Sequence, residues 1–416
     1  MTTPIISVAG ATQRGSKVEN QDTFFITKTG AGAYLGVFDG HGEFGTAVAE
    51  AAADSLRAAG PAAADQLTCA DAFAAADGAS QAAIFNAARL KYGQDCDPRR
   101  EPDGMLTRGL GCMKLTRATL RGGTTGSAVS LDVATLQLKV AHVGDSEVLV
   151  VHESGFSELA TKDHSTTSLE EFARLREDAR AAPGGRVPLV EFHTGGYAPW
   201  GTAPRPTFVL GPDGNYQLNP QGGYYYSNVR KEWASYLYRD TARTEALAFT
   251  RSFGDNALKC VGVTARPDWV PFRLNPSGRS WVITASDGLY DNFTYEELAT
   301  LVRQLGTAGL DAAAIVRRVM EVNRQRGIKN FGPSGLDDTT VCVIAVDPEP
   351  SVSLRLRLEG GATLCQRLSP AAALRLAVGG KGLGLTLCGG VLSMSADAAP
   401  LSWESARLFA KLAAAC

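Results

Sequence analysis

Aspartates beside glycines recur where apolar, strand-like runs of the sequence end. They are Asp39 in VFDGHG, Asp145 in HVGDSE, Asp255 in RSFGDN, Asp287 and Asp291 in TASDGLYDN, and Asp337 and Asp338 in SGLDDTT. A strand can deliver a carboxylate to the edge of a sheet, and a neighbouring glycine lets the backbone approach a ligand closely. Several carboxylates at one edge would repel one another unless cations lay between them. Because these ligands are hard oxygens, the pattern favours magnesium or manganese over zinc.

Whether the aspartates converge depends on the elements that carry them, since a single Asp-Gly pair is also an ordinary turn signal. Apolar runs bounded by Gly, Asn and Asp predict strands. Alanine-rich or amphipathic stretches with helical spacing predict helices. The expected strands are ISVAG, TFFIT, AYLGVF, TGSAVSLDV, LQLKVAHVG, EVLVVHE, ALAF, WVPFRL, RSWVITAS and TTVCVIAV, and the expected helices cover 44–60, 70–90, 168–181, 295–306 and 311–325.

Two segments lack such periodicity. Residues 93–122 are rich in Gly, Arg and Asp and are expected to form a loop or an insertion. Residues 183–240 are rich in Gly, Pro and Tyr, and we expect a long surface loop or flap there rather than a separate core. Loops of this length inside a domain are usually functional or disordered.

Residues 349–416 form a separate compositional unit. Val352, Leu354 and Leu356 alternate with Ser353 and Arg355, which is the pattern of a strand with one buried face. Glycine pairs divide the rest, and WESARLFAKLAAAC has the composition of a terminal helix. We expect a small β-rich appendage that ends in a helix and serves docking or regulation rather than catalysis.

Bulk properties exclude several classes of function. The formal net charge of -2 leaves no basic excess of the kind that nucleic acid binding needs. No window approaches roughly 18 uncharged apolar residues, so no membrane span is expected. The first residues also lack the pattern of a signal peptide. The 8 cysteines are scattered without a CxxC pair, which argues against a zinc finger and is typical of reduced thiols in a cytoplasmic or nuclear protein.

Taken in order, the motifs resemble those of the type-2C, metal-dependent (PPM) serine/threonine protein phosphatases. They are KVENQD at 17–22, VFDGHGEFG at 37–45, GGTTGSAVSL at 122–131, AHVGDS at 141–146, TKDHS at 161–165, LAFTRSFGD at 247–255, TASDGLYD at 284–291 and DDTTVCVIAV at 337–346. The resemblance implies an α+β fold, a sandwich of two antiparallel β-sheets flanked by helices, with metals at one end. It also implies one catalytic domain over 1–348, beyond which 349–416 would be an addition.

The resemblance implies a metal site as well, holding two Mn²⁺ or Mg²⁺ ions and a weaker third. The residues matched to it are Asp39 as the bridging ligand, Gly40 through its carbonyl, Asp287 and Asp337, with Asp22 holding metal-bound water, and Asp145 and Asp291 joining Asp287 at the third site. Asp338 competes with Asp337 for the last position. A shift of one residue in an extended strand points the side chain to the opposite face.

By the same resemblance, a hydroxide that bridges the two cations attacks phosphorus, and His41 is the candidate general acid for the leaving alkoxide. The chain departs from the family in three places. The phosphate-binding arginine falls on Lys17, which lacks the bidentate fork, and Arg14 could substitute for it. Gln21 replaces a glutamate. Glu147 replaces the usual arginine after the Gly-Asp-Ser motif.

The expected function is hydrolysis of phosphoserine and phosphothreonine in protein substrates by a monomer that has no nucleic acid or membrane partner. Two alternatives stay open. A pseudophosphatase would keep the fold as a binding module, but it should lack metal ligands that this chain has. A phosphatase of small phosphate esters could use the same fold, because function lies in the site.

Overall fold

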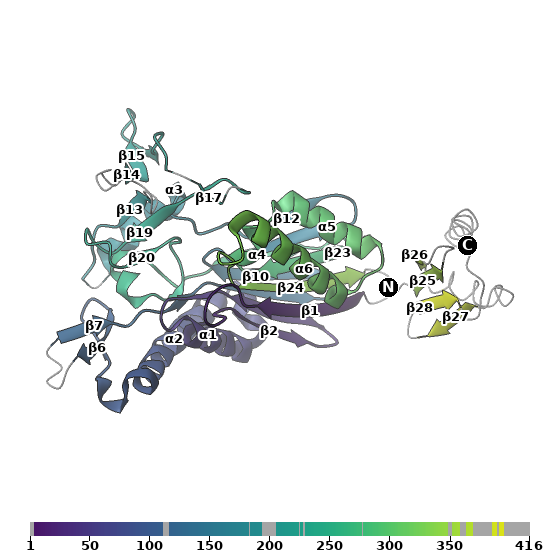
Figure 1. Cartoon of the computed structure of the whole chain (residues 1–416), viewed down its shortest axis with the longest axis horizontal. Helices are drawn as coiled ribbons and strands as arrows, with labels where there is room; N and C mark the ends of the chain where they lie inside the picture. Colours follow the sequence, from purple (N-terminus) through teal and green to yellow (C-terminus); the bar gives the residue numbers. More distant parts are fainter. Residues whose placement is uncertain are drawn as a thin grey trace.

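Two five-stranded antiparallel sheets form the centre of the computed structural model (Figure 1). The first has the order β1-β24-β23-β11-β12, with bounds Ile5–Gln13, Thr339–Asp347, Ser280–Ala285, Glu147–His152 and Ser157–Leu159. The second has the order β2-β3-β9-β10-β22, with bounds Thr23–Lys28, Gly32–Phe38, Gly126–Asp132, Gln137–Val143 and Asp268–Arg273. The structure describes residues 4–110, 116–182, 184–193, 205–223, 225–227, 229–276 and 278–347, and the strand segments 352–357, 363–368, 385–388 and 391–394.

Aliphatic side chains from both sheets pack between them. Val129 and Val140 of the second sheet share one buried cluster with Val150 and Ile344 of the first. Burying one such side chain stabilises the fold by about 1.5–3 kcal/mol. The cluster therefore holds the two sheets face to face, and it fixes the positions of the strand ends that carry the aspartates.

Helices cover both outer faces of the sandwich. α1 (Gly45–Ala59) and α2 (Cys69–Tyr92) pack on the second sheet, whereas α5 (Tyr295–Thr307) and α6 (Ala312–Phe331) pack on the first. α3 (Leu169–Ala181) lies outside these layers, beside the insertion. All five expected helices are confirmed, although α6 runs six residues beyond the expected end at 325.

Local signals in the sequence explain where these helices begin and end. α5 starts at a capping box, in which the Thr294 and Glu297 side chains each bond the other residue's backbone. Ser168 caps α3 and Asp311 caps α6 through side-chain oxygens. α6 ends only at Gly332, where φ is 76° and a residue with a side chain would be strained.

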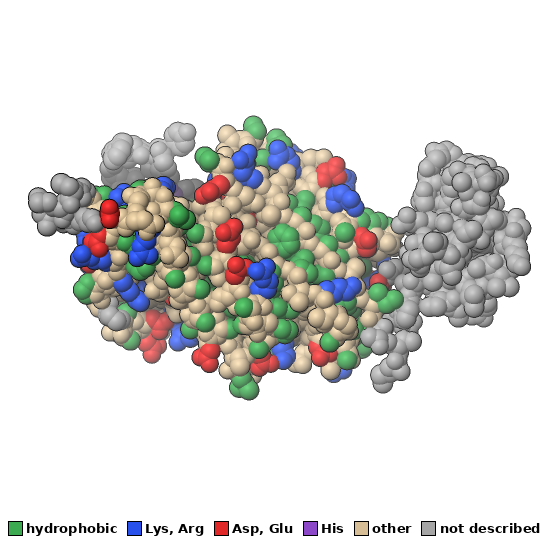
Figure 2. Space-filling view, turned by 90° about the horizontal axis from the view of Figure 1, so that it is seen from below, with side chains coloured by type: hydrophobic (Ala, Val, Ile, Leu, Met, Phe, Trp, Pro, Cys, Tyr) green, Lys and Arg blue, Asp and Glu red, His purple; other side chains and the backbone are tan. Residues whose placement is uncertain are grey.

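The observed architecture is thus the expected α+β sandwich of two antiparallel sheets flanked by helices. Within the described ranges, the structure contains no helix whose length and apolar character would let it cross a membrane. On the face drawn in Figure 2, acidic and basic side chains of the described residues are interspersed, in keeping with the small net charge.

The expectation of a loop over 183–240 is wrong. This segment and the residues just after it form a four-stranded sheet, β14-β13-β19-β20, and two hairpins. The strands of the sheet are β13 (Leu189–Phe192), β14 (Arg205–Pro206), β19 (Ser235–Tyr238) and β20 (Ala246–Leu247), and those of the hairpins are β15 (Phe208–Leu210), β16 (Tyr216–Leu218), β17 (Tyr225–Ser227) and β18 (Glu232–Trp233). Each strand has only two to four residues, too few for a clear period-two pattern.

The insertion shares its core with residues outside it. Val190 and Leu237 are buried in one cluster with Leu175 of α3 and with Val261. Because the apolar partners lie elsewhere in the sequence, composition within 183–240 alone gave no sign of this core. We refer to residues 184–247, as far as they are described, as the insertion.

Residues 93–122, for which a loop or an insertion was expected, contain regular strands. They contain a three-stranded sheet of β5 (Arg99–Arg100), β6 (Leu106–Leu110) and β7 (Thr116–Thr119). Arg239 of the insertion forms an ion pair with Asp103 in this segment. The two irregular segments are therefore in contact with each other.

Several shorter elements lie outside the two large sheets. β4 (Gly40–His41), β8 (Gly123–Thr124) and β21 (Phe253–Gly254) form a three-stranded sheet, and α4 (Asp287–Tyr290) follows β23 directly. Three 3₁₀ turns cover Gly60–Ala64, Gln94–Cys96 and Asn256–Val261.

The C-terminal segment contains a β-sheet, as expected. Its order is β26-β25-β28-β27, with bounds Thr363–Leu368, Val352–Arg357, Val391–Met394 and Leu385–Cys388. These strands pair with one another, and the β25–β28 pair is parallel. The helix expected at 403–416 falls outside the described residues.

Candidate active site

Strand pairing brings the first two aspartates together. Asp22 directly precedes β2, and Asp39 directly follows β3. In this antiparallel pair Thr23 lies opposite Phe38, so both aspartates are at the same edge of the sheet.

The other sheet delivers two more carboxylates to the same place. Asp287 opens α4 just after β23 ends, and Asp337 lies just before β24 begins. β23 and β24 are hydrogen-bonded neighbours. The carboxyl of Asp39 is hydrogen-bonded to Asp287 and interacts electrostatically with Asp22 and Asp337. We call these four residues the first acidic group.

The first acidic group is buried enough to perturb its own ionisation. Burial and the neighbouring Asp287 raise the pKa of Asp39 well above its usual range. Burial raises the pKa of Asp22 to about 7, although Ser286 donates a hydrogen bond to its Oδ2. Asp22 Oδ1 and Asp287 Oδ1 are buried without a hydrogen-bond partner. Buried, orphaned carboxylate oxygens need positive charge, and an all-oxygen donor set fits Mg²⁺ or Mn²⁺.

Asp337 and Asp338 occupy different environments. Asp338 is 1% exposed, and its two oxygens accept hydrogen bonds from the backbone N–H groups of Gly15 and Gln21, at 2.8 and 3.0 Å. Its carboxylate therefore holds the loop before β2 in place. Asp337 keeps a side chain that is 33% exposed and turns it toward Lys17. Of the two residues that the sequence left in competition, Asp337 is the one that joins the acidic group.

The two basic residues proposed for phosphate binding, Lys17 and Arg14, also lie in different environments. Lys17 Nζ lies 2.7 Å from Asp337 Oδ1, within the acidic group. Burial lowers the pKa of Lys17, but the attraction of Asp337 outweighs it and the net shift is upward. Arg14 instead donates from Nη1 to the carbonyl oxygen of Val18, 2.8 Å away, and lines a neighbouring cavity of about 300 Å³.

The DGHG segment is held by its backbone. Thr125 N–H and Thr124 Oγ1 both donate to the carbonyl oxygen of Asp39, at 3.0 and 2.9 Å. A Cβ on Gly40 would lie 2.4 Å from the carbonyl oxygen of Gln21, so only glycine fits there. The GGTTG motif thus fixes the main chain that carries Asp39 and leaves its carboxylate free to face the acidic group.

His41 pairs with an aspartate for which the sequence suggested no partner. His41 Nε2 lies 2.8 Å from Asp255 Oδ2, and Asp255 also accepts a hydrogen bond from Ser252. Burial would raise the pKa of Asp255, but His41 and Ser252 outweigh it and lower the pKa. A Cβ on Gly123 would lie 2.1 Å from Asp255 Oδ2 and 2.4 Å from His41 Nε2. The glycine therefore makes room for the pair.

A second acidic group, made of Asp145, Asp163 and Asp291, adjoins the first. These residues line a cavity of about 380 Å³ together with Asp287 and side chains of the insertion. Burial first, and neighbouring carboxylates second, raise the pKa of all three members well above the usual range. The sequence analysis assigned no role to Asp163. The signal that could have found it is its place in the TKDHS motif, which resembles a motif of the family.

Glu147 forms an ion pair with Arg230 of the insertion. It is 1% exposed, its Oε2 lies 2.7 Å from Arg230 Nη1, and its Oε1 accepts a hydrogen bond from Tyr295 at 2.6 Å. Arg230 lies between β17 and β18 and also reaches Glu232 and Asp291, at 3.1 and 3.9 Å. The available signal in the sequence was the glutamate itself, at a position where the family resemblance implies an arginine.

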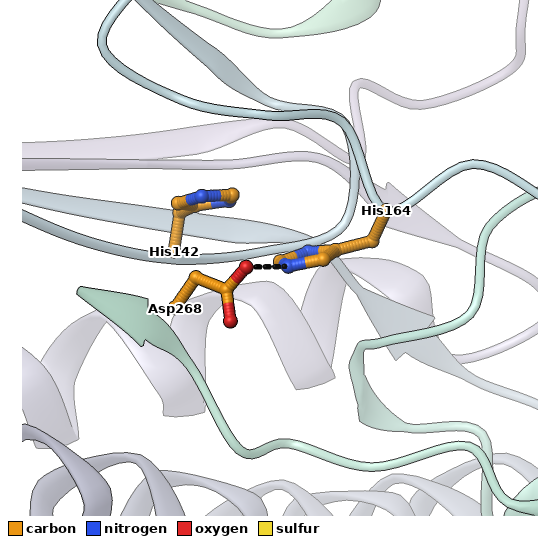
Figure 3. Close-up of side chains that lie close together, drawn as sticks. All are labelled: His142, His164 and Asp268. Atoms are coloured by element: carbon orange, nitrogen blue, oxygen red, sulfur yellow. Dashed lines mark hydrogen bonds and ion pairs between the residues drawn. The ribbon is translucent and has the colours of Figure 1, made fainter. Parts of the chain in front are cut away.

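Within the described residues, one group of three side chains has ligand atoms within 4.8 Å of one another, namely His142, His164 and Asp268 (Figure 3). The described aspartates do not form a group this tight. His164 Nδ1 accepts the N–H of Gly144, so the proton of the neutral ring is on Nε2, which lies 3.2 Å from Asp268 Oδ2. No lone pair then remains on His164 for a cation.

The His164 contacts instead position the second acidic group. Burial lowers the pKa of His142 and of His164, so both rings are neutral at pH 7. His164 follows Asp163 in the sequence, and its bond to Gly144 N–H holds the residue that precedes Asp145. The stacked histidines therefore tie together the two segments that supply these aspartates.

Comparisons with known proteins identify the family of this chain. The family model described as Protein phosphatase 2C matches residues 14–330. Two similar proteins of Arabidopsis thaliana are probable protein phosphatase 2C 61, 29% identical over 120 residues (28% of this chain, 35% of that protein), and probable protein phosphatase 2C 8, 24% identical over 219 residues (52% and 50%). The matches thus span about a third to a half of these relatives.

Among solved structures, a serine-threonine phosphatase 2C from Toxoplasma gondii is similar, with 19% identity and a TM-score of 0.49 over 83% of this chain and 96% of that one. The family match extends over more than half of the sequence. It includes Asp22, Asp39 and Asp287 of the first acidic group, whereas Asp337 lies seven residues beyond the end of the match. This chain belongs to the protein phosphatase 2C family.

Proposed function

We propose that the chain hydrolyses phosphoserine and phosphothreonine in protein substrates. The observation that carries this proposal is the first acidic group, in which four carboxylates from the ends of two sheets meet around orphaned oxygens, with Lys17 beside them. No cysteine or serine nucleophile is needed for such a site, because divalent cations held by carboxylates would activate water for the attack.

Asp39, Asp287, Asp337 and the carbonyl of Gly40 are the residues that would hold two divalent cations, Mg²⁺ or Mn²⁺. When bound, such ions activate water for attack on phosphorus and offset the charge that develops on the phosphoryl oxygens. Asp22 would orient that water from its buried position between Ser286 and the other carboxylates.

His41 is the residue that would protonate the leaving alkoxide. Asp255 fixes one ring nitrogen through the 2.8 Å contact with Nε2. The proton for transfer would then come from Nδ1, and the carboxylate would stabilise the charged ring before transfer. Phe249 packs edge-on against the imidazole and restricts its rotation.

Lys17 would bind the substrate phosphate. Its ammonium is a compact point charge on a flexible stem, so it can contact Asp337 in the free protein and a phosphate when substrate is present. Arg14 lies at the adjoining cavity and is the weaker candidate, because its guanidinium already braces the loop.

The test is a phosphatase assay on a phosphothreonine peptide, with Mn²⁺, with Mg²⁺ and with EDTA. Hydrolysis that requires added metal and is abolished by EDTA is expected. Full turnover in metal-free buffer contradicts the metal assignment. Metal binding without turnover of any ester favours a pseudophosphatase, whereas turnover of small esters alone favours the small-substrate alternative.

A further inference from the structure

Arg230 is a buried cation within a group of carboxylates. Its side chain is 8% exposed, although it comes from a turn of the insertion. Nη1 lies 2.7 Å from Glu147 and donates to Tyr295 at 2.7 Å, while Nη2 lies 3.1 Å from Glu232 and 3.9 Å from Asp291. A guanidinium stays charged at every physiological pH, so this charge is permanent.

The cavity that Arg230 lines is rich in carboxylates. Asp145, Asp163, Asp287 and Asp291 line it, with Arg230, Lys231 and Glu232 from the insertion. Asp145 Oδ1 and Asp163 Oδ1 are buried without a partner. This is where the family resemblance places a weak third metal ion, on Asp145, Asp287 and Asp291.

The position of Arg230 depends on its ion pair with Glu147. The family resemblance places an arginine at this point of β11, but the chain has a glutamate there. The positive charge has in effect moved from the strand to the insertion, where the 2.7 Å contact between Arg230 and Glu147 holds it against Asp291. A divalent ion bound to Asp291 would lie next to the guanidinium and be repelled by it.

We infer that Arg230 is the resident cation of the second acidic group and takes the place of a third metal ion. The insertion then supplies the cation beside Asp291, and the chain binds two divalent ions rather than three. Arg230 acts as a positioning residue through Asp291 and Glu147. This inference rests on the two-metal centre proposed above.

The test is the number of Mn²⁺ ions bound per chain, measured by calorimetric titration of the full-length protein. Wild type is expected to bind two ions. The main variant is Arg230→Met combined with Glu147→Gln, which removes both members of the closest ion pair and so does not leave Glu147 buried without its cation. This double variant is expected to bind a third, weaker Mn²⁺ ion. Adding Asp291→Asn to it should abolish binding of that third ion.

Matched controls separate a charge effect from a loosened insertion. Glu147→Gln alone weakens the contact but keeps the guanidinium, so it should still bind two ions. Arg243→Met removes another ion pair of the insertion, with Glu191, and should also leave two. Circular dichroism verifies that each variant is folded.

Several outcomes would overturn the inference. They are three ions bound by wild type, two ions bound by the folded double variant, and a third ion in the Glu147→Gln control. The wild-type measurement decides the question even if the double variant does not fold. Wild type that binds no Mn²⁺ at all would instead contradict the proposed metal centre.

Discussion

In the first acidic group, the positive charge that the chain supplies comes from Lys17, whose side chain is 40% exposed and belongs to the loop before β2. In the second, Arg230 is 8% exposed and contacts several acidic partners at once. A lysine on a flexible stem can move aside for a cation or a phosphate. A buried guanidinium cannot leave unless the insertion moves with it. The first acidic group can therefore exchange its cation for a ligand, whereas the cation of the second, Arg230, is part of the folded chain.

The largest effect is expected from Arg230→Met. Removing one partner of a buried ion pair leaves Glu147 uncompensated and should lower the free energy of unfolding by about 3–5 kcal/mol. Urea denaturation measures this loss. Combining the change with Glu147→Gln should restore most of the stability. Equal losses in the single and double variants would show that the pair is not what holds the insertion.

Glu171 is a buried carboxylate that forms ion pairs with two arginines, Arg174 and Arg251. Burial raises its pKa, but Arg251 and Arg174 outweigh burial and lower it from 4.5 to about 2. Because the folded-state pKa is lower than the unfolded one, the stabilisation is complete above about pH 5 and is lost as the pH falls toward 2. The loss should be on the order of 3 kcal/mol.

Urea denaturation of wild type and of Glu171→Gln, repeated across that pH range, measures this contribution. The difference in stability between the two proteins should shrink as the pH falls. A difference that stays constant from pH 6 to pH 3 would mean that Glu171 titrates at its ordinary pKa.

The two groups should differ in catalysis. Asp39→Asn changes the proposed ligand of both ions and should lower kcat/KM on a phosphothreonine peptide by about 100-fold or more. Asp291→Asn, in the second acidic group beside Arg230, should lower it by no more than about 10-fold. Assays at saturating Mn²⁺ compare the two. An Asp39→Asn variant that keeps more than a tenth of wild-type activity would argue against the assignment.

The smallest effect on stability is expected at Lys17. The Lys17–Asp337 pair is partly exposed on both sides, so Lys17→Met should change the free energy of unfolding by less than about 1 kcal/mol. The KM for a phosphopeptide should nevertheless rise, and Lys17→Arg should retain binding. Unchanged KM in Lys17→Met would transfer the phosphate-binding role to Arg14, where Arg14→Met is the matched variant.

Much of the scaffold was predictable because it depends on local patterns. The helix at 295–307 follows from the amphipathic spacing and the Thr294/Glu297 capping box, which involve neighbours in the sequence. The sandwich strands follow from long apolar runs such as TTVCVIAV. The strands of the insertion other than β20 were missed because they are short and bury their side chains against distant residues such as Leu175 and Val261.

The sequence by itself predicted that candidate cation ligands lie at strand ends, because strand periodicity and glycine turns are properties of adjacent residues. Tertiary structure gave Asp337 and Asp338 different environments, since the amides that occupy Asp338 come from residues 15 and 21. It also decided the partners of Glu147 and His41. Arg230 lies 83 positions from Glu147, and Asp255 lies 214 from His41. Ion pairs over such separations form only when packing brings the segments together, so no local pattern encodes them.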